Sequence, residues 1–190
     1  CVEQLECDSD ATEILFYVDT NDPRVIDGTW ARAKKLDNFK SSNVVVSGRR
    51  GPTEVRTSVR RDRIVEMKEA SKQYIEDTHY VLGIEDDTIF PANTLTTLLR
   101  AYEGRPKLGY VEGVQVGRWG VKMIGAWRVN DIHKPTGYCT LPFIKVEDNN
   151  RYLERIDGGG FYCYLTPTKL YKEAKYTWSE PAGPDVAYGL

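Results

Sequence analysis

The sequence predicts an α/β fold in which helices flank both faces of a mixed, mostly parallel sheet. Within the first hundred residues, apolar β-branched runs alternate with segments free of helix breakers, and this order is typical of strands joined by crossover helices. The chain has 190 residues, 41% of them hydrophobic, which suffices for one substantial core. One apolar run ends in three consecutive carboxylates. We therefore expect one domain over residues 1–190, with polar groups at the edge where its strands end.

Apolar runs and breakers place the elements in chain order. Strands are expected over residues 14–18, 44–46, 79–84 and 155–165, with shorter pieces within 108–116 and 121–129. Helices are expected over residues 27–39, with Asp27 as the cap, and over 58–76, 91–102 and 166–175. A Pro- and Gly-rich loop follows from residue 178. Because the chain starts at Cys1 without Met and ends without a helix stop signal, we expect it to be part of a longer protein.

The composition argues against several classes of protein. A formal net charge of −2 offers no global basic surface, so we expect no nucleic-acid partner. No apolar run reaches the length of a membrane span. The 4 cysteines have neither the density of a disulfide scaffold nor the spacing of a zinc site. A reducing, cytoplasmic location is therefore expected.

Glu85, Asp86 and Asp87 form the acidic run at the end of the third strand. Carboxylate oxygens are the ligands that hard cations such as Mg²⁺ and Mn²⁺ prefer. Acidic residues ahead of a helix also stabilise its positive N-terminal end or simply face water. Three adjacent carboxylates repel one another, however, and neither alternative requires all of them. The run therefore indicates a metal site. The other motifs of the sequence must decide between this interpretation and the two alternatives.

Other motifs surround the acidic run in a definite order. A strand ends in Asp19, a helix begins with Arg60-Arg61-Asp62-Arg63, glycines follow Asp157, and Asp185 lies in a Gly-Pro-Asp-Val sequence after Trp178. In this order the motifs resemble the GT-A class of nucleotide-sugar-dependent glycosyltransferases, especially the family 2-like enzymes, over nearly the whole chain. The resemblance implies a GT-A-like (Rossmann-like) fold. It also implies hexosyltransferase-like transfer from a UDP- or GDP-sugar donor to an acceptor hydroxyl of unknown type.

The metal motif of this family is an Asp-x-Asp pattern, and here Glu stands in its first place. The resemblance implies that Asp87 and then Asp86 bind Mn²⁺ or Mg²⁺, while Glu85 lies nearer the ribose. The bound cation would stabilise the negative charge that builds up on the departing nucleoside diphosphate.

Three further residues are expected at the donor. Asp19 resembles the position that contacts the nucleobase or ribose, although an Asp in such a loop also caps local backbone. Arg61 and Arg63 match basic positions where a guanidinium pairs with a phosphate or holds an acidic residue in place. A solvated helix face would also carry such arginines.

The glycine run and Trp178 are expected on the sugar and acceptor side. Gly158, Gly159 and Gly160 interrupt a strand, which favours close backbone approach, with a bulge or bend as the alternative. In the glycosyltransferases that the chain resembles, the corresponding segment lines the pocket of the transferred sugar. Asp157 is expected to bind a sugar hydroxyl or to pair with Arg155. Trp178 offers a flat face for sugar stacking, although aromatic residues of α/β domains more often pack in the core.

Asp185 is the expected catalytic base. In the similar family, an Asp on the loop after a Trp takes the proton of the acceptor hydroxyl, and one carboxylate suffices for that role. Pro184 stands where the family more often has Glu. The alternative role for Asp185 is a helix N-cap. A single base on the acceptor side implies inversion at the anomeric carbon.

Two other functions fit the same kind of sheet. A sugar nucleotidyltransferase would make activated sugars, but such enzymes usually carry a Gly-rich basic loop after the first strand, where this chain has Asp19-Thr20-Asn21-Asp22. A non-catalytic carbohydrate-binding or assembly domain would keep the fold without turnover.

Overall fold

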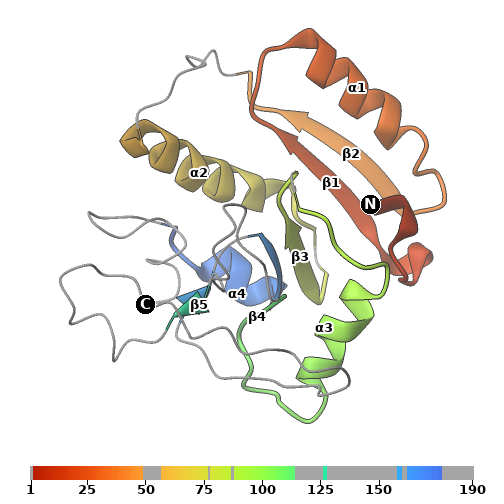
Figure 1. The fold of residues 1–190 in the computed structure, drawn as a ribbon, viewed down its shortest axis with the longest axis vertical. Helices are drawn as coiled ribbons and strands as arrows, with labels where there is room; N and C mark the ends of the chain where they lie inside the picture. The colour runs from red at the N-terminus through yellow and green to blue at the C-terminus, as the bar shows by residue number, and fades with distance from the viewer. Residues whose placement is uncertain are drawn as a thin grey trace.

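A computed structural model describes residues 2–48, 57–76, 78–86, 88–113, 126–127, 158–159 and 162–176. These residues form a mixed α/β structure with short parallel and antiparallel sheets (Figure 1). The strands are β1 (Glu13–Val18), β2 (Ser41–Val46), β3 (Tyr80–Ile84), β4 (Val111–Glu112), β5 (Ala126–Trp127), β6 (Gly158–Gly159) and β7 (Cys163–Pro167). The α-helices are α1 (Pro23–Ala33), α2 (Thr57–Ser71), α3 (Thr94–Tyr102) and α4 (Thr168–Glu173), and 3-10 turns cover Val2–Gln4, Ser9–Ala11 and Lys72–Tyr74.

The first helix begins earlier than its predicted cap. Asp22 is the N-cap of α1, and its side chain accepts a hydrogen bond from the Arg24 N–H at 2.9 Å. Pro23 follows at the first helical position, where a fixed φ and a missing N–H carry no penalty. The prediction of Asp27 as the cap is therefore wrong. The helix also ends at Ala33, well before the predicted residue 39.

The strand pairing differs from the prediction of a mostly parallel sheet. β1 and β2 pair in parallel, with Glu13 opposite Ser41 and Val18 opposite Val46. β7 lies between β3 and β4 and is antiparallel to both, and β5 pairs antiparallel with β6. β3 and β4 consequently run in the same direction, as alternation of strand and helix requires, but a strand from late in the chain separates them. The described strands are therefore mixed, and they do not confirm a GT-A fold.

Alternate residues of β7 bury the two faces of its sheet. Cys163 and Leu165 face α3, where they pack with Leu98 and Ala101. Tyr164 faces the opposite side, where it forms a second cluster that includes Tyr171 of α4 and apolar residues of α2. Figure 1 shows α2 and α3 on opposite sides of β3. Helices thus cover both faces of this sheet, as the sequence predicts for the domain.

Burial of Cys163 has a consequence for its chemistry. Only 8% of the residue is exposed, and this burial raises the pKa of its thiol to about 11. Because the thiolate is the reactive form, we expect Cys163 to resist iodoacetamide at pH 8 while the partly exposed Cys7 reacts. Mass spectrometry of the alkylated peptides checks this expectation. Modification of Cys163 at the same rate as Cys7 in the folded protein would contradict it.

No helix in the described part of the chain is long and apolar enough to cross a membrane.

Candidate functional site

Asp19 lies directly after β1 and is held by side chains from two other elements. Its Oδ1 accepts a hydrogen bond from Ser47 Oγ, just after β2, at 2.5 Å. Its Oδ2 accepts one from Arg63 Nε of α2 at 2.8 Å, and a terminal guanidinium nitrogen of Arg63 donates to the Asp19 backbone carbonyl at 2.9 Å. The Asp19 side chain is 7% exposed and that of Arg63 is 24% exposed. Asp19, Ser47 and Arg63 therefore form a largely buried polar cluster, which we call the Asp19 cluster.

These contacts argue against local capping by Asp19 and against a solvated face for Arg63. Thr20 and Asp22 provide the local capping of the loop. The Asp22 N–H donates to Thr20 Oγ1, and the Asp22 side chain caps α1. The side-chain partners of Asp19 are instead 28 and 44 residues away. Arg63 holds an acidic residue in place, the second of its two expected roles, and does not lie on a solvated helix face. The Arg61 side chain lies outside the described part of the structure.

Glu85 and Asp86, the described residues of the acidic run, lie in a turn, which we call the acidic turn, tied to the start of β7. The Glu85 N–H donates to the Tyr162 carbonyl at 3.0 Å, and Thr88 Oγ1 donates to the same carbonyl at 3.1 Å. The Thr88 N–H closes the turn on the Glu85 carbonyl at 3.0 Å. Glu85 is half-buried and Asp86 is exposed. Because α3 begins only at Thr94, neither residue lies in the first turn of that helix, and the helix-stabilising alternative does not apply to them.

The start of β7 lies at the same edge of the sheet as the acidic turn. Since β7 is antiparallel to β3, its first residue, Cys163, lies opposite the last residue of β3, Ile84. The Gly113 N–H after β4 also donates to the Cys163 carbonyl at 3.0 Å. We call this side, where β3 and β4 end and β7 begins, the carboxyl edge. Gly158 and Gly159 precede β7 by a few residues in sequence and form β6, which pairs with Trp127 and Ala126 of β5.

Two polar residues near these positions are not among the site residues that the sequence predicts. Ser47 binds Asp19. The sequence could have indicated this contact, because Ser47 directly follows the second strand and neighbouring parallel strands end at a common edge. Glu112 is the last residue of β4 and lies opposite Tyr164 in the register. Tyr110 donates its hydroxyl to Glu112 Oε2 at 3.1 Å. No motif in the sequence marks Glu112, since its position depends on pairing with β7.

The carboxylate oxygens of Glu85 and Asp86 are of the chemical type that binds hard cations. Asp86 presents a carboxylate to solvent beside the half-buried Glu85, and Mn²⁺ and Mg²⁺ prefer such oxygens. Among the described residues, no group of three or more His, Cys, Asp or Glu side chains is placed to hold a metal ion. Asp87, the first predicted metal ligand, lies outside the described residues. The other predicted site residues that lie outside them are Asp157, Gly160, Trp178 and Asp185.

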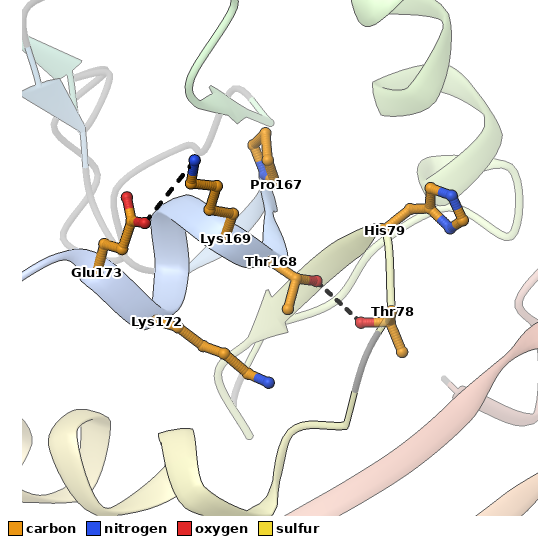
Figure 2. A pocket seen from close by; sticks show the side chains of 7 residues that line it. All are labelled: Thr78, His79, Pro167, Thr168, Lys169, Lys172 and Glu173. Atoms are coloured by element: carbon orange, nitrogen blue, oxygen red, sulfur yellow. Dashed lines mark hydrogen bonds and ion pairs between the residues drawn. The ribbon is translucent and has the colours of Figure 1, made fainter.

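An open hollow of about 450 Å³ lies at the opposite edge of the sheet. Its lining comes from the segment before β3 and from α4, and Figure 2 shows Lys172 on the side of Thr78 while Lys169 pairs with Glu173. Thr78 and Thr168 share a hydrogen bond of 2.9 Å between their hydroxyls. This hollow contains none of the predicted site residues. It is therefore distinct from the carboxyl edge, on which the predicted chemistry depends.

A comparison of the chain with models of known protein families and with curated proteins finds no match.

Proposed function

We propose that the chain is a metal-dependent glycosyltransferase domain that moves a sugar from a nucleoside-diphosphate sugar to an acceptor hydroxyl with inversion. A GT-A-like arrangement of the complete chain is part of this proposal. The support comes from the order of motifs along the sequence, from the side chains that meet where β1 and β2 end, and from the carboxylates of Glu85 and Asp86 directly after β3. Ligands of open α/β sheets bind at such strand ends.

One observation carries the proposal further than the motifs alone. The turn that contains Glu85 and Asp86 is hydrogen-bonded to Tyr162, only two residues after the glycine run. Glu85 and Tyr162 are 77 residues apart in sequence (162 minus 85), and their contact brings the chain that follows the predicted sugar-binding segment to the turn of Glu85 and Asp86. A site that holds a diphosphate and a sugar at once needs this juxtaposition.

The residues then take the following roles. Asp19, oriented by Ser47 and Arg63, contacts the nucleobase or ribose, and Arg61 binds a phosphate. Glu85 lies toward the ribose, and Asp86 and Asp87 hold Mn²⁺ or Mg²⁺. That cation, when bound, supplies positive charge to the leaving diphosphate. The sugar lies against Asp157 and the glycines, while Trp178 stacks on the acceptor side.

Asp185 removes the proton of the acceptor hydroxyl as its oxygen attacks the anomeric carbon. Replacing Asp185 by Asn is expected to reduce transfer by a factor of about 10² to 10⁴ while donor binding stays unchanged, because general base catalysis contributes that much. The measurement compares transfer rates with the affinity for Mn²⁺ and UDP or GDP. Asp37→Asn, at an exposed position, is the matched control. Survival of transfer in Asp185→Asn would show that the base is elsewhere.

Hydrolysis of a panel of UDP- and GDP-sugars, with and without Mn²⁺, tests the function itself. A glycosyltransferase releases nucleoside diphosphate, and EDTA should abolish the release. A sugar nucleotidyltransferase would instead form the nucleotide sugar from a sugar phosphate and a nucleoside triphosphate. Binding without any turnover would indicate the non-catalytic carbohydrate-binding domain. If the folded protein neither binds nor hydrolyses any donor, the transferase proposal is wrong.

A further inference from the structure

The hollow between α4 and the segment before β3 has no part in the proposed reaction. Its volume of about 450 Å³ lies within the usual range of small-molecule pockets, roughly 300–1,000 Å³. Its lining includes the side chains of Thr78, Thr168 and Lys172, which decide what kind of ligand fits. The charge and the hydrogen bonds of these three residues indicate an anion.

The backbone around the hollow is fixed by sheet pairing and by a contact to α2. β3 and β7 are paired up to this edge of the sheet, and the Thr168 N–H donates to the His79 carbonyl at 3.0 Å. Three residues further along α4, the Tyr171 hydroxyl shares a hydrogen bond of 2.8 Å with the buried Ser71 of α2. Because these elements hold one another, a ligand would meet walls that are already formed.

Lys172 brings a positive charge to the hollow. Its ammonium makes no ion pair with a carboxylate of the described residues, and its hydrogen bond to the Glu76 carbonyl is long, at 3.4 Å. The other lysine of the lining, Lys169, pairs with Glu173 at 4.0 Å, so the net charge of that pair is zero. Figure 2 shows Lys172 on the side of Thr78, away from the pair. With His79 neutral, the lining carries one net positive charge, which favours an anionic ligand.

The hydroxyls of Thr78 and Thr168 supply a hydrogen-bond donor as well. They share a hydrogen bond of 2.9 Å, and Thr168 is only 3% exposed although it lines the hollow. Each hydroxyl has one proton to donate. The other acceptor near Thr78, the Tyr80 carbonyl, is 3.3 Å away, beyond the usual range of an O–H···O hydrogen bond. When Thr78 donates to Thr168, the Thr168 proton is left for an oxygen atom in the hollow.

We propose that the hollow binds a small organic phosphate monoester, with the phosphate on Lys172 and Thr168 and the carbon part against Pro167. An ammonium and a hydroxyl both donate to phosphate oxygens, and lysine is a common phosphate-binding residue. Pro167 and the carbon chain of Lys169 add apolar surface, which a bare phosphate ion would leave unused. This site lies away from the carboxyl edge and does not depend on the proposed glycosyltransferase activity.

The test titrates ¹⁵N-labelled protein with glycerol 3-phosphate in the presence of EDTA and follows the amide resonances. Saturable shifts of Thr78, Thr168 and Lys169 are expected, with a Kd of about 1 mM. Lys172→Met removes the charge at an exposed position and should weaken binding about tenfold, the loss expected for one charged hydrogen bond. Lys35→Met, at an exposed position outside the lining, changes the net charge equally and should leave the Kd unchanged.

A second pair of variants tests the hydroxyl. Thr168→Val should weaken binding about fivefold, as loss of a neutral hydrogen bond does, whereas Thr168→Ser keeps the hydroxyl and should bind like the unmodified protein. Inorganic phosphate serves as the comparison ligand and should bind more weakly than the ester, because it has no carbon part to place on Pro167.

Several outcomes would overturn this site. Absence of saturable shifts, or equal weakening in Lys172→Met and Lys35→Met, would leave no more than a general attraction of charges. Shifts confined to the amides of Glu85, Asp86 and Thr88 would place the ester at the carboxyl edge instead. Equal affinities for the ester and for inorganic phosphate would refute the contact with Pro167. Failure of the nucleotide-sugar panel would refute the proposed function and leave this titration unaffected.

Discussion

Replacing Arg63 by Met is expected to lower the free energy of unfolding by about 3 kcal/mol, because removal of one partner leaves a buried charge uncompensated. The Asp19 side chain is 7% exposed and receives hydrogen bonds from Arg63 on both its carboxylate and its backbone carbonyl. Among the described residues, Ser47 alone would then donate to the carboxylate. Urea unfolding, with the midpoint and the slope both recorded, measures the change.

The chain offers a matched control for this substitution. Arg24 also grips an aspartate with two guanidinium nitrogens, at 3.1 and 2.7 Å from Asp22, but its side chain is 90% exposed. Solvent and salt screen such a pair, so Arg24→Met should leave the unfolding midpoint almost unchanged. Asp19→Asn combined with Arg63→Met should recover part of the loss, since no buried charge remains. Equal effects of Arg63→Met and Arg24→Met would refute the burial argument.

Replacing Gly83 by Ala is expected to cost about 3 kcal/mol, at the upper end of the usual range for overpacking. A Cβ at this position would lie 2.3 Å from two ring carbons of Tyr164 and 2.6 Å from its hydroxyl oxygen. The ring cannot easily move, because Tyr164 is 1% exposed, stacks on Tyr110 at 5.4 Å and lies under the Lys68 ammonium at 5.0 Å. Thermal unfolding followed by circular dichroism gives the measurement.

Gly28 is the control for Gly83, because nothing lies within 4 Å of an added Cβ there and it is within α1. Gly28→Ala should therefore raise stability by up to about 1 kcal/mol through helix propensity. Adding Tyr164→Leu to Gly83→Ala should give a smaller total loss than the sum of the two single losses, since the clash would be gone. The close approach of the Tyr164 ring to β3 would be contradicted if the stability losses of the two substitutions were strictly additive, or if Gly83→Ala did not lower the stability.

Sequence patterns predicted the strands better than their pairing. The apolar runs at residues 14–18 and 44–46 lie within β1 and β2, and the run at 79–84 exceeds β3 by one residue, because a buried strand needs continuous apolar or β-branched residues. The position of β7 between β3 and β4 was not predictable from those runs, since pairing joins residues far apart in sequence. The start of α1 was missed for a local reason, because Asp22-Pro23 and Asp27 are both plausible starts and only the folded loop distinguishes them.

For the candidate site too, the sequence predicted single residues better than the contacts between them. Asp19 and Arg63 were identified from their places after a strand and near a helix start, and the structure brings them together. Their mutual contact, however, depends on how α2 crosses the end of β1, which no spacing in the sequence encodes. Ser47 and Glu112 escaped attention because a serine after a strand and a single glutamate are common on any surface. The metal ligation by Asp87 and the base role of Asp185 remain predictions.

The central place of β7 also has a consequence for the order in which the molecule can assemble. β3 and β7 are joined by pairs such as Ile84 with Cys163, and 79 residues separate these two positions (163 minus 84). During synthesis, β1 and β2 can pair once residue 46 has emerged, whereas β3 has no β-sheet partner among the described strands until β7 appears. The turn that contains Glu85 and Asp86 therefore acquires its neighbour only after Tyr162 and β7 have been synthesised. A nascent chain cut before Tyr162 carries Glu85 but lacks the carbonyl to which the Glu85 N–H donates.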